Sequence, residues 1–514
     1  MARHRLPPLL SAERRVARRW AEARNTAGVL RVLIAAFDGL QPAQVSPALT
    51  PVIHELAAAG VTFRRHHAVF PTVTRTNAAS MVTGRYPGAH GLAANTLALP
   101  ELDRHRIVDA LEPTLAPLAA ATGGRVLLVP TLGELLAPHG RSYAAVVGGT
   151  SGNAYVQHPR AALVGGAVIH PEFTLPAAHH DAVRRRFGPW PEKRAPSLGR
   201  IARVSDVLLD HVLPEVDPDV AMVWFPEPDT SQHAAGVDSP PARQALTAAD
   251  AQLGRILAAL RRRGVDPDVL VVSDHGYSTI AAVVDVEREL RQAGFPRGDR
   301  PGGVNMAPNG GAVLFYAHDG ETAVVERLAT WLAEQRWAGA LVGGRADAAH
   351  LGLLPGDAAG IAGPRAPDIA MSFRWDPEPG ANGVPGHSDA SGGAPGQGTH
   401  GSGSPHDLRS LLVAAGPSFR RGVASDLPSG NVDLTPTVLR LLGLATDAPF
   451  DGRVLVEAFR HGPAAPVPPP TRREHRVQRL TRTGRLVQRL VIEAVGATTY
   501  ISSLDARRPE GEPG

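Results

Sequence analysis

The chain has no cysteine in its 514 residues. Disulfide bonds and thiolate metal sites are therefore excluded, and any bound metal must be held by histidines and carboxylates. No run of about 20 apolar residues is present, so no transmembrane helix is expected. Residues 1–28 lack the apolar region of a secretory signal, which predicts a cytoplasmic protein.

The positive charge lies at the two ends of the chain. The net charge is +4, but residues 1–28 and 471–493 each carry +5, so the remainder carries −6. We interpret 1–28 as a basic N-terminal extension and 461–514 as a Pro-rich linker followed by a basic C-terminal tail. Apolar residues at Val477, Leu480, Val487, Leu490 and Val491 predict a helix in that tail. Contact with nucleic acid or a membrane surface is a secondary prediction that rests on these tails alone.

Strand and helix signals alternate between residues 29 and 460. Strands are predicted at 30–37, 220–225, 269–273 and 411–415, and helices at 51–59, 240–263 and 435–442. This alternation predicts an α/β fold with a mostly parallel sheet. We interpret residues 29–460 as one catalytic domain, in which the less regular segments at about 100–218 and 277–398 are cap-like insertions.

Acids and histidines follow several of the predicted strands. They are Asp38, then Asp229 and His233 in P-D-T-S-Q-H, Asp274 and His275 in S-D-H-G, and His400 in G-T-H-G. Open parallel sheets bind ligands beyond the carboxyl ends of their strands, so these side chains are expected to converge. Oxygen and nitrogen ligands of this kind hold Zn²⁺ or Mn²⁺.

A threonine-rich segment, F-P-T-V-T-R-T-N-A-A-S-M-V-T-G, lies between the first two groups of ligands. Pro71 interrupts the chain, and Thr74 is predicted to begin a helix that runs to Gly84. A hydroxyl at a helix N-terminus faces unpaired N–H groups and the positive end of the dipole, which suits a phosphate. Thr74 is therefore a candidate nucleophile, although it is also a plausible helix cap, and Thr72 and Thr76 compete with it.

A series of short motifs runs through residues 30–460. They are F-D-G at 37–39, L-T-P at 49–51, A-G-V-T-F at 59–63, F-P-T-V-T at 70–74, V-T-G-R-Y-P-G-A-H-G at 82–91, Asn95, E-P-D-T-S-Q-H at 227–233, S-D-H-G at 273–276, G-T-H-G at 398–401 and V-D-L-T-P-T-V-L-R-L-L-G-L at 432–444. In this order they resemble the type I phosphodiesterase/nucleotide pyrophosphatase branch of the alkaline phosphatase superfamily. The resemblance implies a three-layer α/β sandwich with a mostly parallel central sheet.

The resemblance also implies a role for each candidate residue. One divalent metal ion would be held by Asp229, His233 and His400, and a second by Asp38, Asp274, His275 and the Thr74 oxygen. Asn95 would donate a hydrogen bond to a phosphoryl oxygen. The implied activity is hydrolysis of a small-molecule phosphodiester through a phosphothreonine on Thr74, with two ions that are expected to be zinc or alternatively manganese.

The chain departs from the family pattern beside the nucleophile. Nucleotide-cleaving members usually have an aromatic residue there, and this chain has Arg75. These members also commonly have Asn-His where this chain has Asn77-Ala78. An aromatic residue often follows their conserved asparagine, whereas Asn95 is followed by Thr96-Leu97. The substrate therefore stays open, and Arg75 is predicted to bind a second anionic group or a monoester dianion.

Other functions remain as alternatives. A phosphomonoesterase or a phosphonate hydrolase would share the same metal set. Phosphonoacetate hydrolases bind the carboxylate of their substrate with lysines, however, and Lys193 is the only lysine in this chain. Residues 239–243, S-P-P-A-R, match the letters of a sulfatase motif, but we interpret them as the start of a helix. The non-enzymatic alternative is a binding protein that is stabilised by its metal ions.

Overall fold

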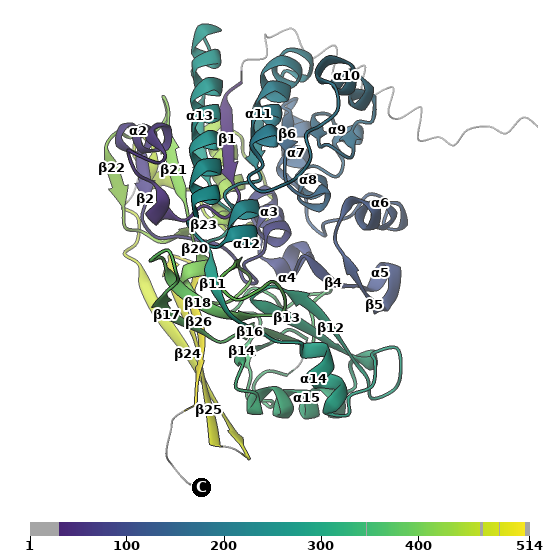
Figure 1. Cartoon of the computed structure of the whole chain (residues 1–514). Helices are drawn as coiled ribbons and strands as arrows, with labels where there is room; N and C mark the ends of the chain where they lie inside the picture. The colour runs from purple at the N-terminus through teal and green to yellow at the C-terminus, as the bar shows by residue number, and fades with distance from the viewer. Residues whose placement is uncertain (1–29, 346, 463–465, 483, 509–514) are drawn as a thin grey trace, which may run out of the picture.

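The computed structural model describes residues 30–345, 347–462, 466–482 and 484–508 (Figure 1). Its centre is a nine-stranded sheet in the order β22-β2-β21-β10-β1-β9-β6-β7-β8. Strand β1 (Val32–Phe37) is buried along its whole length and lies between β9 (Val220–Phe225) and β10 (Asp268–Val272), which both run parallel to it. The predicted strands at 30–37, 220–225 and 269–273 are therefore confirmed to within two residues.

The remaining strands extend this sheet on both sides. They are β2 (Val61–Phe63), β6 (Tyr143–Val147), β7 (Ala167–Ile169), β8 (Thr174–Leu175), β21 (Leu412–Ala415) and β22 (Val423–Ser425). Strand β21 runs antiparallel to β10 and β2, and β8 runs antiparallel to β7, while the other pairings are parallel. The sheet is thus mostly parallel, as the alternation of strands and helices predicts.

Helices cover both faces of the sheet. Alternate side chains of β1 enter two separate cores: Leu33, Ala35 and Phe37 face one, and Val32, Ile34 and Ala36 face the other. The first core is completed by α2 (Pro51–Ala59), α11 (Leu198–Val207) and α13 (Pro240–Arg262), and the second by α3 (Thr74–Thr83), α8 (Ser151–Gln157) and α17 (Leu434–Leu441). The result is the three-layer sandwich that the resemblance implies, with α13 beside β1 in Figure 1.

Two further sheets are formed by residues between β10 and β21 of the central sheet. Five strands pair in the order β12 (Val304–Asn309), β13 (Ala312–Ala317), β16 (Ile369–Phe373), β14 (Ala338–Gly343) and β15 (Leu354–Pro355). The helices α14 (Val286–Gln292) and α15 (Thr322–Glu334) share a core with them. A smaller sheet contains β17 (Trp375–Pro379), β18 (Pro385–Ala390), β11 (Ser278–Val283) and β19 (Gly398–Thr399). The hairpin β4 (Thr96–Leu99) and β5 (Arg104–Asp109) lies against β12.

The interpretation of residues 100–218 as an insertion is wrong in part. Strand β6 pairs with β9 and β7 pairs with β6, so both are strands of the central sheet, and α11 covers them. Sequence periodicity does not reveal which strands become neighbours, because pairing partners in a parallel sheet are distant in the chain.

The helix predicted in the C-terminal tail is also wrong. Strands β24 (Thr471–Thr481), β25 (Gly484–Val495) and β26 (Thr498–Arg507) form an antiparallel sheet there. Leu486, Leu490 and Ile492 are buried on β25, and their even spacing is that of a strand. The few apolar residues among the arginines fit both periods, and packing against the neighbouring sheet decides between them. The predicted extension at 1–28 lies outside the described residues. Within the described part of the chain, no helix is both long and apolar enough to cross a bilayer.

Candidate active site

Four segments bring polar side chains to the carboxyl end of the central sheet. Asp38 directly follows β1, Asp274 and His275 follow β10, and α12 (Asp229–Ala235) begins shortly after β9. His400 comes from another direction, directly after β19. The first three segments meet because β9, β1 and β10 are parallel neighbours and end at the same edge.

One group contains Asp38, Asp274 and His275. His275 Nε2 lies 3.1 Å from Asp274 Oδ2 and 3.7 Å from Asp38 Oδ1. The other oxygens of both carboxylates are engaged, since Trp224 Nε1 donates to Asp38 Oδ2 at 2.9 Å and Gly39 N donates to Asp274 Oδ1 at 3.0 Å. These two contacts direct the remaining oxygen of each carboxylate toward the imidazole.

The second group contains Asp229, His233 and His400. Asp229 Oδ1 lies 3.4 Å from His233 Nε2 and 3.5 Å from His400 Nε2, and the two imidazole nitrogens are 3.1 Å apart. The spacing of Asp229 and His233 places them one turn apart on α12, on the same face. His275 joins the groups, because its ring stacks on that of His400 at 3.7 Å.

Each of the three histidines is held in the same way. The Nδ1 atoms lie next to backbone carbonyls: His233 at 3.0 Å from Gly398 O, His275 at 3.0 Å from Gly276 O, and His400 at 2.8 Å from Thr72 O. A carbonyl only accepts, so Nδ1 carries a proton, and in the neutral ring Nε2 is left with a lone pair. Histidines that bind metal ions are oriented by this kind of contact.

The electrostatics of the groups favour a bound cation. Asp38 Oδ1 and Asp274 Oδ2 are buried and accept no hydrogen bond from the described residues. Burial and the neighbouring carboxylates of Asp274 and Asp229 raise the pKa of Asp38 well above its ordinary value. Burial opposes the charged form of His275, but Asp274 and Asp38 outweigh it and raise its pKa to about 10. Converging lone pairs in a strongly negative pocket fit two divalent ions.

Thr74 is the first residue of α3, as the sequence predicts, and its hydroxyl faces the first group. Thr74 Oγ1 lies 3.2 Å from His275 Nε2. Thr72 is engaged elsewhere, because its hydroxyl donates to Ser402 O and accepts from Gly401 N. The Thr76 hydroxyl is buried and makes no hydrogen bond to the described residues. Of the three threonines, Thr74 is therefore the one placed beside the candidate metal ligands.

Asn95 and Arg75 lie together beside Thr74. Asn95 Oδ1 accepts a hydrogen bond from Arg75 N at 3.0 Å, which leaves the amide NH₂ as the group that can donate. The Arg75 guanidinium is buried, donates to Asn95 O at 2.8 Å and forms an ion pair with Asp109. Asn309 Oδ1 accepts from the backbone N–H groups of Asn95 and Thr96. Asn95 is thus fixed from both sides, and Arg75 takes part in fixing it.

Four supporting residues were not foreseen from the sequence. Trp224 orients Asp38, and the Tyr277 hydroxyl donates to Asp229 Oδ1 at 2.5 Å. Asp109 pairs with Arg75, and Asn309 holds the backbone at Asn95. Tyr277 directly follows the S-D-H-G motif, and this position could have indicated a role at the site. No local sequence signal marks the other three residues.

The site geometry agrees with a match to known proteins. The model of the family described as type I phosphodiesterase / nucleotide pyrophosphatase matches residues 32–401, which is most of the chain. The chain belongs to this family. All seven candidate metal ligands and Asn95 lie within the matched range.

Curated venom phosphodiesterases are similar to this chain over about half of its length. It is 25% identical to a venom phosphodiesterase of Macrovipera lebetinus over 255 residues, which are 49% of this chain and 26% of that protein. It is 24% identical to venom phosphodiesterase 2 of Crotalus adamanteus over the same length, which is 27% of that protein. The aligned region is thus about a quarter of these relatives.

Solved structures share the fold. Murine ectonucleotide pyrophosphatase/phosphodiesterase 5 aligns with a TM-score of 0.58 and 18% identity, over 82% of this chain and 97% of the murine one. An inactive variant of the murine protein, in complex with AMP, aligns equally well. The murine protein and this chain therefore share one mixed α/β fold over the greater part of the chain.

Proposed function

We propose that this chain hydrolyses phosphodiesters with two divalent metal ions, through a covalent phosphothreonine on Thr74. The observation that carries the proposal is the convergence of three histidine Nε2 atoms and of unpaired carboxylate oxygens, with the Thr74 hydroxyl 3.2 Å from one of those nitrogens, His275 Nε2. In the neutral form of each ring, the contact that Nδ1 makes leaves the lone pair on Nε2, so the donor set can accept a metal ion in place of a proton.

The two groups of ligands suit one ion each. Asp38, Asp274, His275 and the Thr74 oxygen would hold the first, and Asp229, His233 and His400 the second. Nitrogen and oxygen donors favour zinc, with manganese as the alternative. Two bound ions would lower the pKa of the threonine hydroxyl and stabilise the charge of an in-line displacement.

The residues of the chain then have separate tasks. Thr74 Oγ forms the new bond to phosphorus while the bond to the leaving oxygen breaks on the opposite side. The Asn95 amide donates a hydrogen bond to a non-bridging oxygen, whose negative charge grows in the transition state. Water then attacks the phosphorus of this intermediate, which still carries the second ester group, releases a phosphate monoester and restores the Thr74 hydroxyl.

The names of the curated relatives favour a diester over other phosphate esters, because they are venom phosphodiesterases. The inactive murine variant was solved with AMP, which is a phosphate monoester of a nucleoside and does not itself favour a diester. In this chain, Arg75 occupies the position after the nucleophile, and its guanidinium is paired with Asp109. We therefore assign Arg75 the task of holding Asn95 in place on the phosphate-binding side, and leave the group beyond the phosphate unspecified.

Two threonines on the same helix give a controlled test. Thr74→Ala should lower kcat for bis-p-nitrophenyl phosphate by roughly 10³-fold or more, because the nucleophile is lost. Thr76→Ala removes a buried hydroxyl two residues further along the helix, on roughly the opposite face, and should retain most of the activity. Metal content of both variants is measured alongside. Full activity of Thr74→Ala would refute the proposed mechanism.

Metal removal separates the enzyme from a metal-stabilised binding protein. The enzyme should lose hydrolysis in EDTA and regain it with Zn²⁺ or Mn²⁺. A panel of diester, monoester, nucleotide and phosphonate substrates then ranks the alternatives by kcat/KM. A protein that binds zinc but turns over none of these substrates is the binding protein and not the hydrolase.

A further inference from the structure

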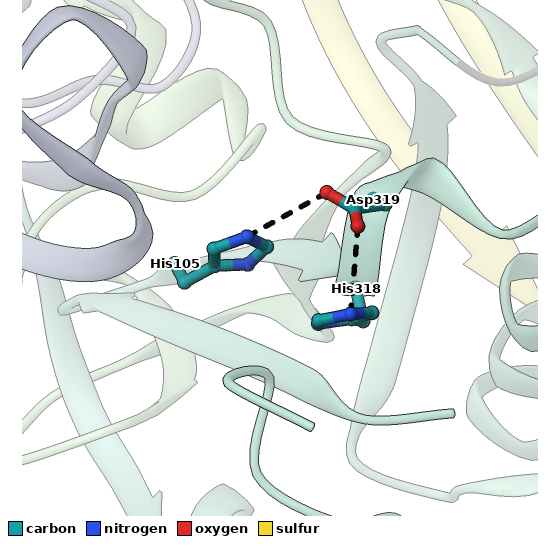
Figure 2. Close-up of side chains that lie close together, drawn as sticks. All are labelled: His105, His318 and Asp319. Atoms are coloured by element: carbon teal, nitrogen blue, oxygen red, sulfur yellow. Dashed lines mark ion pairs between the residues drawn. The ribbon is translucent and has the colours of Figure 1, made fainter. Parts of the chain in front are cut away.

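A second cluster of metal-ligand side chains lies away from the candidate active site. His105 is on β5, and His318 and Asp319 form the turn η4 (His318–Gly320) that follows β13. Figure 2 shows the three side chains converging from these two elements. His105 Nε2 is 3.5 Å from Asp319 Oδ1, and His318 Nε2 is 3.5 Å from Asp319 Oδ2. One ligand atom from each residue lies within 4.8 Å of the others.

The two imidazoles are aligned with each other. Their ring centroids are 4.8 Å apart, and the planes differ by 24°. Each Nε2 atom approaches one of the two oxygens of the same carboxylate. Ligand atoms on a tetrahedral zinc ion, with bonds of about 2.0–2.2 Å, are roughly 3.3 Å apart, which is close to the 3.5 Å between each Nε2 atom and its nearest carboxylate oxygen.

The surroundings hold the cluster in this arrangement. His318 Nδ1 lies 3.0 Å from Gly298 O, so Nδ1 carries the proton and Nε2 keeps its lone pair. The carbonyl of His105 accepts a hydrogen bond from Asn305 Nδ2 at 2.6 Å. His318 is thus oriented by a contact between Nδ1 and a backbone carbonyl, as the histidines of the candidate active site are.

We propose that His105, His318 and Asp319 form a third metal site, which binds one zinc-like divalent ion. Two imidazole nitrogens and one carboxylate oxygen are borderline ligands that favour Zn²⁺ over Mg²⁺ or Ca²⁺, and water completes the coordination. The side chains of His318, His105 and Asp319 are 17%, 32% and 53% exposed, so the ion has access from solvent.

The neighbouring Arg104 supplies a sharp prediction. Its Nη1 lies 3.4 Å from Asp319 Oδ1, and its side chain is 63% exposed. A cation there competes with the metal for the same carboxylate, so removal of Arg104 should strengthen metal binding. A cluster that existed only as ion pairs would have no metal binding to strengthen.

The ion would join two separate parts of the fold. Strand β5 belongs to the hairpin that begins beside Asn95 and ends at Asp109, whereas η4 follows a strand of the five-stranded sheet. Metal binding at the far end of β5 should therefore fasten this hairpin and raise the melting temperature. This consequence depends on the cluster alone and not on the activity proposed above.

The test measures bound zinc per chain by equilibrium dialysis followed by elemental analysis. Asp319→Asn removes the carboxylate but keeps its shape, and Asn tolerates the φ of 47° at this position. His105→Ala/His318→Ala removes both imidazoles. His350→Ala is the matched control, because His350 is a 70% exposed histidine paired with one carboxylate, Glu326. Circular dichroism confirms that each variant is folded.

The wild type should bind one zinc ion more than Asp319→Asn and the double-histidine variant, and as many as His350→Ala. Arg104→Ala should bind the extra ion more tightly than the wild type does. Zinc should raise the melting temperature of the wild type by more than that of Asp319→Asn. The test depends on the difference in bound zinc between the wild type and each variant. Because all of these proteins have the same active site, the number of ions held there does not affect the difference. Equal zinc content in the wild type, Asp319→Asn and the double-histidine variant would overturn the proposal.

Discussion

The Nε2 atoms of His233 and His400 lie 3.1 Å apart, although 167 residues separate them in the chain. Each nitrogen carries a lone pair, because the Nδ1 atoms are hydrogen-bonded to Gly398 O and Thr72 O. Two lone pairs at this distance repel each other unless a proton or a metal ion lies between them, and the carboxylate oxygen of Asp229 within 3.4 and 3.5 Å of the two nitrogens suits the metal ion. The pair is therefore the clearest sign of a metal ion on the Asp229 side of the site.

The first prediction concerns this pair. His400→Ala should lower the bound zinc by one ion per chain and lower kcat/KM by roughly 100-fold or more, since a direct ligand is lost. His406→Ala is a suitable control, because His406 is a nearby histidine outside the ligand groups. Zinc content and hydrolysis of bis-p-nitrophenyl phosphate are measured together. Unchanged zinc in His400→Ala would place the metal elsewhere.

The second prediction tests an outer contact of the same group. The Tyr277 hydroxyl donates to Asp229 Oδ1, so Tyr277→Phe should weaken zinc binding by about 10–100-fold without altering the ligands themselves. Competition with a chelator measures the affinity. Tyr143→Phe serves as the control, because it removes another buried hydroxyl, one that bonds Gln157 instead. Equal affinities in the two variants would show that Tyr277 does not support the metal.

The third prediction concerns Arg75. Its guanidinium holds Asn95 O and pairs with Asp109, so Arg75→Ala and Asp109→Asn should each lower kcat by roughly tenfold with little change in zinc content. The double variant should be no worse than the poorer single one, because the residues act through one contact. If Arg75 also binds substrate, Arg75→Ala alone should raise KM for monoesters more than for diesters. Additive losses with no substrate dependence would contradict both roles.

The fourth prediction concerns stability against pH. His90 is buried, donates from Nε2 to Ser80 Oγ and accepts the backbone N–H of Leu92 at Nδ1, so the fold requires it neutral. Burial, aided by Arg365 and Arg85, lowers its pKa to about 3. A lowered pKa contributes stability above the unfolded value near 6.5, and this contribution is lost as the pH falls toward 3.

The free energy of unfolding should accordingly fall by about 2 kcal/mol more between pH 7.5 and 5.0 in the wild type than in His90→Gln. Urea unfolding of the metal-free proteins measures both values, and the other buried histidines are common to the two proteins. A pH dependence of His90→Gln equal to that of the wild type would show that His90 is not the group responsible.

The sequence by itself determined the local elements and the types of ligand. Strands β1 and β9 and helices α2, α3 and α13 begin and end within two residues of their predicted limits, because apolar runs, proline starts and glycine stops are local signals. The candidate ligands were identifiable in the same way, since each follows a strand or lies in a short motif. The S-P-P-A-R letters at 239–243 indeed begin a helix, α13.

Only the tertiary structure decided which distant residues meet. The assignment of β6 to the central sheet, and of residues 471–507 to three strands instead of a helix, depends on partners far along the chain. The same is true of Asp109 beside Arg75, Trp224 beside Asp38, and His105 beside Asp319. Periodicity reports only which face of an element is apolar, whereas strand pairing and close packing determine what that face touches.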